Sequence, residues 1–301
     1  MFDRFQAYWR FYNVGAVRGV AAFGLLLTSL AGCMPVDLLN ATISTRGLTV
    51  YRDIAYGTDP KQKLDIYAPK SAAGNAPVIV FFYGGAWQTG DKKEYLFAAQ
   101  ALAAQGAIVV VPNYRLYPQV TFPGFLEDGA AATAWTLANI RKWGGDPMSL
   151  FLVGHSAGAY ISVMLALNRE YFAAAGIPDV KLAGAVGLSG PYDFLPLTRA
   201  DVKAIFEVVP EMAVTQPIHY ARPDAPPLLL LTGDNDDTVY PRNTEHLADR
   251  IRALGGQAED RIYSGVTHVG TVLALTPLFR DRAPVLADIA AFVAKHRSTA
   301  E

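Results

Sequence analysis

The chain has 301 residues, of which 51% are hydrophobic and 18% are charged, so it can bury one large core. Lys and Arg number 26 against 27 Asp and Glu, and the resulting net charge of −1 gives no sign of the basic face that a nucleic-acid-binding protein needs. Five His and one Cys leave little material for a metal site and exclude an internal disulfide framework.

Residues 1–33 have the features of an export signal. Arg4, Arg10 and Arg18 precede an apolar stretch over residues 20–31. This stretch is too short to cross a bilayer as a helix but is typical of the apolar part of a secretory signal. It ends in Leu-Ala-Gly-Cys at Cys33, which resembles a bacterial lipobox and implies cleavage followed by lipidation of that cysteine.

The lipobox resemblance implies an exported protein of the bacterial cell envelope, attached to a membrane by its lipid and facing the periplasm or the cell surface. The alternatives are an uncleaved N-terminal anchor and a plain signal peptide with an incidental cysteine. Residues 34–47 are expected to form a linker, and residues 48–301 to form one folded domain.

From residue 48 onward the chain alternates strand-like and helix-like segments. Residues 48–56 and 62–67 alternate apolar and polar side chains, which indicates antiparallel strands at a sheet edge. Continuously apolar runs, as in strands buried on both faces, follow at 78–83, 107–111, 150–153, 182–188 and 228–231. Helical patterns occupy 95–105, 124–142, 157–168, 244–254 and 284–296, and one more strand is expected at 258–263. This order predicts an α/β fold, with a doubly wound, mostly parallel sheet and helices on both faces.

The strongest chemical motif is Gly-His-Ser-Ala-Gly at residues 154–158, between a predicted strand and a predicted helix. A nucleophilic serine on such a tight turn presents its hydroxyl above the sheet, and side chains in place of Gly154 or Gly158 would collide with the neighbouring elements. The helix that follows points its first amides at the site. We therefore predict Ser156 as a nucleophile.

A serine hydroxyl needs a base, and the base needs an acid to orient it. In folds of this type the chain order is serine, acid, histidine. Asp234, Asp236 and Asp237 all follow the strand 228–231, and any of them could be the acid. The pattern Gly-x-x-Asp-x-x-Val over residues 233–239 resembles the acid loop of proteins with this chain order, so we choose Asp236, with Asp237 as its nearest rival. His268 follows the last predicted strand and is the expected base, because the other histidines lie in a helix, before the acid, in the C-terminal tail or beside the serine: His246, His219, His296 and His155.

Acyl transfer also needs amides that stabilise a negative oxygen. We expect one from Ala157, after the nucleophile, and others from Gly84 and Gly85 in the loop after strand 78–83, where glycines turn amides towards the substrate. Aromatic residues after strand ends are candidates for substrate binding: Trp87, Tyr192 and Phe194. The long connection 191–227, with a predicted helix at 201–208, is expected to form a small cap.

Taken in order, these motifs resemble the hormone-sensitive-lipase-like and feruloyl/acetyl-xylan-esterase-like carboxylesterases of the α/β-hydrolase superfamily. The segments that carry the resemblance are YGGAWQTGDK at 83–92, PNYRLYPQVTFPGFLEDGAAA at 112–132, GGDP at 144–147, GHSAG at 154–158, SGPYDF at 189–194, GDNDDTV at 233–239 and the final His268. The family usually has His before the glycine pair, where this chain has Tyr83. Prenylcysteine methylesterase-like members, which the chain also resembles, likewise lack that His.

The resemblance implies the α/β-hydrolase fold and a serine carboxylesterase that hydrolyses short-chain acyl or methyl esters through a Ser–Asp–His triad. It implies a small-molecule ester substrate and neither a metal nor an organic cofactor. Alternatives are an arylformamidase or another activated-amide hydrolase, a small peptidase, and a non-catalytic surface binding protein on the same scaffold. A peptidase usually carries a propeller or a large cap, for which the chain has no room.

Overall fold

The computed structural model describes residues 36–72 and 74–298. The predicted signal, the lipobox and Cys33 lie outside these residues. Within them, the helices are all too short or too polar to cross a membrane. A short helix, α2 (Val36–Ala41), stands where a linker is predicted. From Asn40 onward the described chain is one compact unit.

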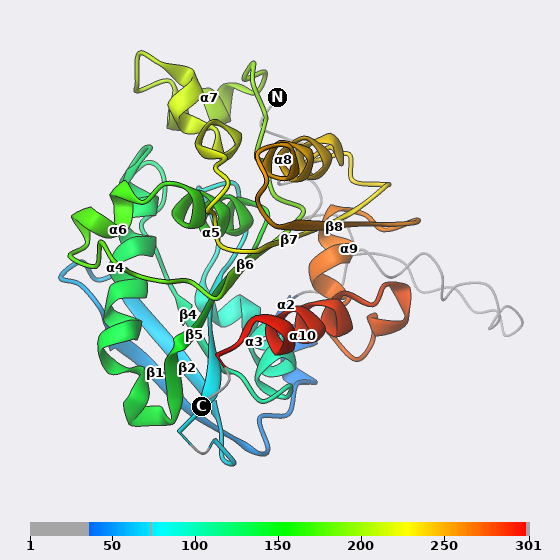
Figure 1. The fold of residues 1–301 in the computed structure, drawn as a ribbon. Coiled ribbons are helices and arrows are strands. Elements are labelled where there is room, and N and C mark those ends of the chain that lie inside the picture. Colours follow the sequence, from blue (N-terminus) through cyan, green and yellow to red (C-terminus); the bar gives the residue numbers. More distant parts are fainter. Residues whose placement is uncertain (1–35, 73, 299–301) are drawn as a thin grey trace, which may run out of the picture. The chain divides into compact units, whose positions relative to one another are not determined.

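An eight-stranded sheet forms the centre of this unit (Figure 1). Its strands run in the spatial order β1-β2-β4-β3-β5-β6-β7-β8. Their bounds are β1 (Leu48–Ala55), β2 (Lys63–Pro69), β3 (Ala76–Phe82), β4 (Ile108–Pro112), β5 (Gly145–His155), β6 (Gly184–Leu188), β7 (Leu228–Gly233) and β8 (Ala258–Tyr263). The pairs β1–β2 and β2–β4 are antiparallel, and every other pair is parallel. The predicted fold class is therefore confirmed.

Burial follows the sequence pattern of the strands. Every residue of β3, β4, β6 and β7 is buried, and these strands carry the continuously apolar runs. The edge strands β1 and β8 are partly exposed, as their polar residues require. Because the central strands lose both faces to other elements, helices must cover the sheet on both sides.

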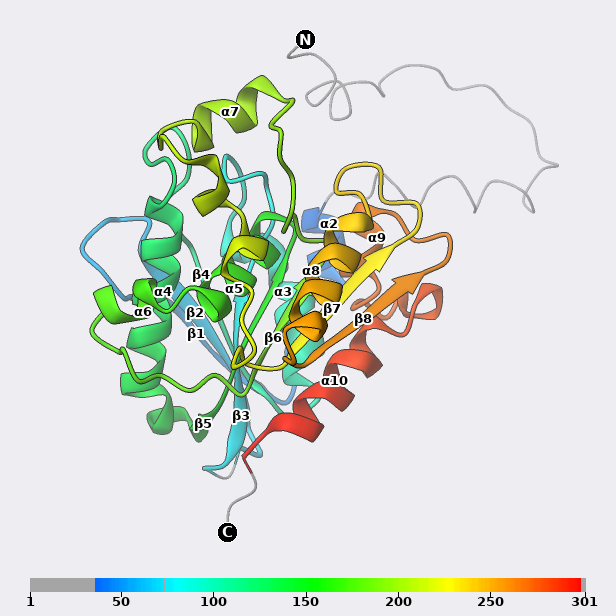
Figure 2. The same cartoon turned by 45° about the horizontal axis from the view of Figure 1, so that its top comes forward.

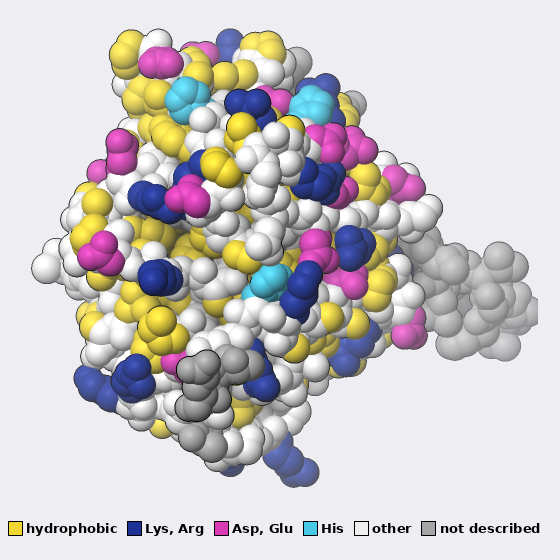
Figure 3. Space-filling model, in the orientation of Figure 1, with side chains coloured by type: hydrophobic (Ala, Val, Ile, Leu, Met, Phe, Trp, Pro, Cys, Tyr) yellow, Lys and Arg dark blue, Asp and Glu magenta, His cyan; other side chains and the backbone are white. Residues whose placement is uncertain are grey.

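Two layers of helices cover the two faces of the sheet (Figures 1 and 2). One layer holds α4 (Gly124–Asn139), α5 (Ala157–Leu167) and α8 (Arg242–Ala253), and the other holds α3 (Leu96–Ala103) and α10 (Val285–His296). The cap contains α7 (Ala200–Phe206), which lies apart from both layers at the upper end of the view in Figure 1. On the face shown in Figure 3, charged side chains of both signs are interspersed, in keeping with the small net charge.

Several bounds differ from the predicted ones for local reasons. Strand β5 begins at Gly145, five residues before the predicted run, because residues 146–148 are partly or fully exposed and interrupt the apolar pattern. Helix α4 ends at Asn139 and continues as a 3₁₀ turn that stops at Gly144, whose φ of 87° is left-handed. Besides α2, two short helices are not predicted by the sequence pattern, α6 (Glu170–Ala174) and α9 (His268–Leu273).

Candidate active site

Ser156 occupies a sharp turn between β5 and α5. Its backbone has φ 56° and ψ −119°, a left-handed conformation that is strained for a residue with a side chain. The Ser156 amide donates to the Leu188 carbonyl of β6 at 2.8 Å, which holds the turn against the sheet. The predicted strand–serine–helix arrangement is confirmed.

The two glycines that flank this turn are required by the space around them. A Cβ built on Gly154 would lie 2.2 Å from the carbonyl oxygen of Gly158 in the following helix. A Cβ built on Gly158 would lie 2.0 Å from the carbonyl oxygen of Phe82, at the end of β3. Backbone atoms cannot move aside as a flexible side chain can, so the predicted collisions are present at both positions.

The structure brings Ser156, His268 and Asp236 together from three separate strand ends. His268 Nε2 lies 2.8 Å from Ser156 Oγ, and His268 Nδ1 lies 2.9 Å from Asp236 Oδ2. An ionised carboxylate only accepts hydrogen bonds, so Nδ1 carries the proton and Nε2 is free to accept the serine proton. His268 and Asp236 are 8% and 2% exposed, which keeps water away from the pair.

The loop after β7 aims one of its three aspartates at the histidine. Asp236 Oδ1 accepts the amides of Thr238 and Val239 at 3.1 and 2.8 Å, leaving Oδ2 for His268. Burial raises the pKa of this carboxyl, but the hydrogen bond and charge of His268 and the Val239 amide outweigh burial and hold the pKa below its usual value. Asp236 therefore remains ionised at neutral pH.

The other two aspartates of this loop, Asp234 and Asp237, do not contact His268. Asp234 is exposed and accepts the Gly265 amide at 2.6 Å, which ties the acid loop to the loop that carries His268. Asp237 is exposed, and within the described part of the chain its side chain accepts a hydrogen bond only from the neighbouring Thr238 hydroxyl, at 3.4 Å. Asp234 thus shapes the loop, and Asp237 is a solvated charge.

His155, beside the nucleophile, has a role that the sequence does not reveal. Its Nε2 lies 3.1 Å from the backbone carbonyl of His268, and since a carbonyl only accepts, Nε2 must carry the proton. Its Nδ1 is buried without a hydrogen-bond partner among the described residues. Burial, followed by the nearby His268, lowers the pKa of His155 to about 3. His155 is therefore neutral and braces the backbone that carries the base.

This buried neutral histidine predicts a pH dependence of stability. In the unfolded chain His155 takes up a proton below its usual pKa of 6.5, whereas in the folded chain it does so only near 3. Its contribution is thus complete above about pH 6.5 and declines by about 1.4 kcal/mol per pH unit as the pH falls towards 3. We expect the free energy of unfolding to fall by about 2 kcal/mol more in the wild type than in His155→Gln between pH 7 and pH 5.

Urea titrations at the two pH values measure this difference. Gln keeps a side-chain N–H for the His268 carbonyl but does not titrate. Equal pH dependence in the two proteins would contradict the buried, neutral state of His155.

The predicted oxyanion amides need one correction. The Gly84 amide already donates to the Tyr95 hydroxyl at 3.1 Å, so it is not directed at a substrate. Among the described residues, none accepts a hydrogen bond from the amides of Gly85 or Ala86. Gly85 has φ 131° and Ala86 has φ 51°, and both residues are half-buried. The candidate set is therefore Gly85, Ala86 and Ala157, the last of which is the first residue of α5.

The predicted substrate-binding aromatics divide into two kinds. Trp87 is 4% exposed, and its ring lies in a cluster with Tyr160, Phe194 and Phe206, at centroid distances of 5.2, 6.3 and 4.8 Å. Phe194 is half-buried and links this cluster to the cap. Tyr192 is fully buried, with its ring against glycines of β6 and the following turn. It therefore packs the core and presents no surface to a substrate.

No group of three His, Cys, Asp or Glu in residues 36–72 and 74–298 could hold a metal ion. The geometry instead places a hydroxyl, an imidazole and a carboxylate in hydrogen-bonded series beside amides that are free to donate. Such a set can activate a hydroxyl for attack on a carbonyl and stabilise the oxyanion that results.

Comparison with known proteins agrees with this reading of the fold. The sequence pattern of the BD-FAE family matches residues 64–251. The chain belongs to the BD-FAE family. The resemblance to α/β-hydrolase carboxylesterases is thereby confirmed. A solved structure described as a truncated carbohydrate esterase from gut microbiota superposes with a TM-score of 0.72 at 19% identity, covering 83% of this chain and 97% of that one.

Two relatives of this BD-FAE member carry informative names. The isoprenylcysteine alpha-carbonyl methylesterase ICME of Arabidopsis thaliana is 31% identical over 247 residues, which cover 74% of this chain and 57% of the relative. The kynurenine formamidase of Danio rerio is 30% identical over 178 residues, which cover 59% of this chain and 58% of the relative. The chain thus spans less than two thirds of the length of either relative.

Proposed function

We propose that this protein is a serine carboxylesterase that hydrolyses short-chain acyl or methyl esters of small molecules. The observation that carries the proposal is the hydrogen-bonded series from Ser156 Oγ to His268 to Asp236, with separations of 2.8 and 2.9 Å. The names of the plant methylesterase and the gut esterase support ester chemistry.

The reaction proceeds in two steps, acylation of the serine and hydrolysis of the acyl-enzyme. His268 Nε2 takes the Ser156 proton as Oγ forms a bond to the ester carbonyl carbon, and the oxyanion accepts the amides of Gly85, Ala86 and Ala157. His268 then gives that proton to the departing alcohol, leaving an acyl-enzyme. Water repeats the sequence, so the acid is released and the serine regains its proton.

The aromatic cluster predicts a preference for short acyl chains. Trp87 directly follows the oxyanion amides and Tyr160 lies about one helical turn after Ser156, so a long chain bound there would have to displace rings that already pack together. Turnover of p-nitrophenyl esters by the purified full-length protein should decrease from acetate to butyrate to octanoate. Octanoate hydrolysed faster than acetate would contradict this preference. A folded protein that hydrolyses none of the three would contradict the esterase proposal.

A second candidate is hydrolysis of an activated amide, which the name of the Danio rerio relative supports. The same triad serves both reactions, because both pass through a tetrahedral oxyanion. N-formylkynurenine distinguishes them: a higher kcat/KM on this formamide than on p-nitrophenyl acetate would favour the amide reaction.

A further inference from the structure

The loop that carries the oxyanion amides contains two adjacent glycines, Gly84 and Gly85. Glycine has the most backbone freedom of any residue, and Gly85 adopts φ 131°. Oxyanion stabilisation, however, depends on donors that are held in place before the reaction begins. The peptide between these glycines therefore needs an anchor from outside the loop.

Tyr95 supplies a contact of this kind. Its hydroxyl accepts the Gly84 amide at 3.1 Å, from eleven residues further along the chain. Its ring packs against those of Phe81, Tyr83 and Phe97, at centroid distances of 5.7, 5.9 and 5.7 Å. Burial raises the pKa of Tyr95 to about 12, so the phenol remains protonated throughout the pH range of ester hydrolysis.

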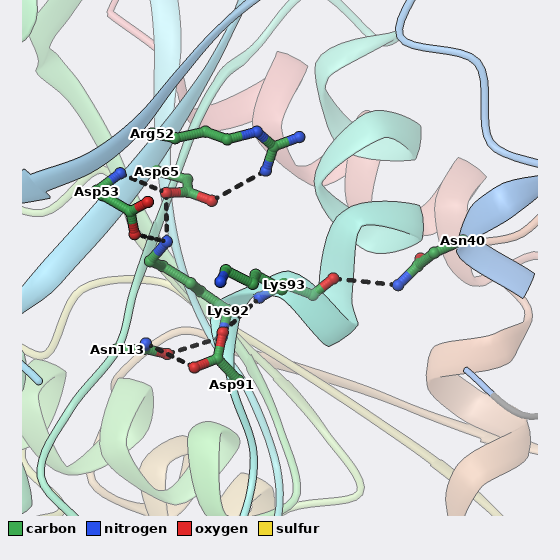
Figure 4. Close-up of polar contacts among 8 residues, drawn as sticks. All are labelled: Asn40, Arg52, Asp53, Asp65, Asp91, Lys92, Lys93 and Asn113. Atoms are coloured by element: carbon green, nitrogen blue, oxygen red, sulfur yellow. Dashed lines mark hydrogen bonds and ion pairs between the residues drawn. The ribbon is translucent and has the colours of Figure 1, made fainter. Parts of the chain in front are cut away.

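The 3₁₀ helix that bears Tyr95, η3 (Lys92–Tyr95), is itself fixed by an ion cluster whose central pair, Lys92 and Asp65, is buried (Figure 4). Lys92 is 1% exposed, and its Nζ lies 2.5 Å from Asp65 on β2 and 2.7 Å from Asp53 on β1. Asp65 is fully buried and also accepts Arg52 and the Asp53 amide. Displacing Lys92 would break its ion pair with this buried carboxylate, at a substantial cost in stability.

Two asparagines fix the backbone of the same helix. Asn113 accepts the Lys92 amide at 2.7 Å and donates to Asp91 at 2.9 Å. Asn40 donates to the carbonyls of Lys93 and Glu94, at 3.1 and 3.0 Å. Figure 4 shows these contacts approaching η3 from separate directions. The hydroxyl of Tyr95 therefore sits on a rigid support.

We propose that Tyr95 is a positioning residue for the oxyanion hole, holding the Gly84 peptide so that the next two amides, of Gly85 and Ala86, face the developing oxyanion. This proposal rests on the proposed esterase function. It also gives the Gly84 amide a role, because this amide bonds to the Tyr95 hydroxyl and not to the substrate.

The test is Tyr95→Phe, which keeps the ring and removes only the hydroxyl. We expect kcat and kcat/KM for p-nitrophenyl acetate to fall about tenfold, the effect of one lost hydrogen bond, with KM unchanged within about twofold. The rate constant for inactivation by paraoxon should fall in parallel, because its phosphoryl oxygen uses the same amides. Active sites are counted by the 4-nitrophenolate that paraoxon releases, so that kcat is expressed per functional site.

The matched control is Tyr171→Phe, the same change on α6, where the hydroxyl bonds to no described residue. This variant should retain the wild-type kcat. A wild-type kcat per titrated site in Tyr95→Phe would overturn the proposal, and so would a loss confined to KM or to the number of sites. Ser156→Ala in the same assay tests the esterase mechanism separately from the role of Tyr95. If Ser156→Ala keeps its activity, the proposed esterase mechanism is wrong, whatever the result for Tyr95→Phe.

Discussion

Replacing Ser156 by Ala should lower kcat for ester hydrolysis by at least about 10⁴-fold, because the acyl-enzyme can no longer form. The remaining rate would come from the oxyanion amides acting on water. Alanine removes no contact on which the fold depends, since among the described residues the serine hydroxyl bonds only to His268. Circular dichroism and the unfolding midpoint should therefore remain those of the wild type, and kcat with p-nitrophenyl acetate measures the loss.

Ser162→Ala is the matched control for this variant. Ser162 lies on α5, and its buried hydroxyl has no partner in the part of the chain that the structure describes. Its removal should leave kcat within about twofold of the wild type. A Ser156→Ala protein that keeps a tenth of its activity, or a Ser162→Ala protein that loses it, would contradict the assignment.

Asp236→Asn should lower kcat at pH 7 by about 10⁴-fold. The Asn amide can donate to Nδ1 of His268, which places the imidazole proton on Nε2, the atom that must accept the Ser156 proton. The fold should persist, because Asn retains an oxygen for the amides of Thr238 and Val239. Steady-state kinetics with p-nitrophenyl acetate measure the effect.

Asp237→Asn tests the alternative that the sequence leaves open. Asp237 is exposed and lies outside the hydrogen-bonded series, so its substitution should change kcat by no more than about twofold. A large loss of kcat in Asp237→Asn, with little loss in Asp236→Asn, would show that Asp237 is the acid of the triad.

The fold could be predicted because its central strands are continuously apolar, a pattern that only burial on both faces explains. The short helices could not be predicted: α6 has five residues, and α2 and α9 have six each, which is fewer than two helical turns. The predicted cap helix is present as α7, shifted by one to two residues at its ends.

The nucleophile and base could be placed from the sequence, because the strand ends and the chain order restrict both. The direction in which a loop side chain points could not be predicted from the sequence. Asp236 faces His268 because the Thr238 and Val239 amides hold its other oxygen, and neighbouring aspartates lack that geometry.

The oxyanion loop shows a second limit. The engagement of Gly84 by Tyr95 depends on where η3 lies, and η3 is held by an ion pair between Lys92 and Asp65. These residues lie 27 positions apart in the sequence. No local pattern reports such a contact. The burial of Tyr192 against β6 has the same origin, since it depends on the path of the chain after that strand.

The most direct test of the central claim is to identify the residue that paraoxon modifies, using peptide mass spectrometry on the full-length protein. The nucleophile assignment predicts one diethylphosphoryl group per chain, on Ser156, with esterase activity lost in proportion to the label. A label on another residue that accompanies inactivation, or a fully labelled Ser156 in a protein that still hydrolyses esters, would contradict it.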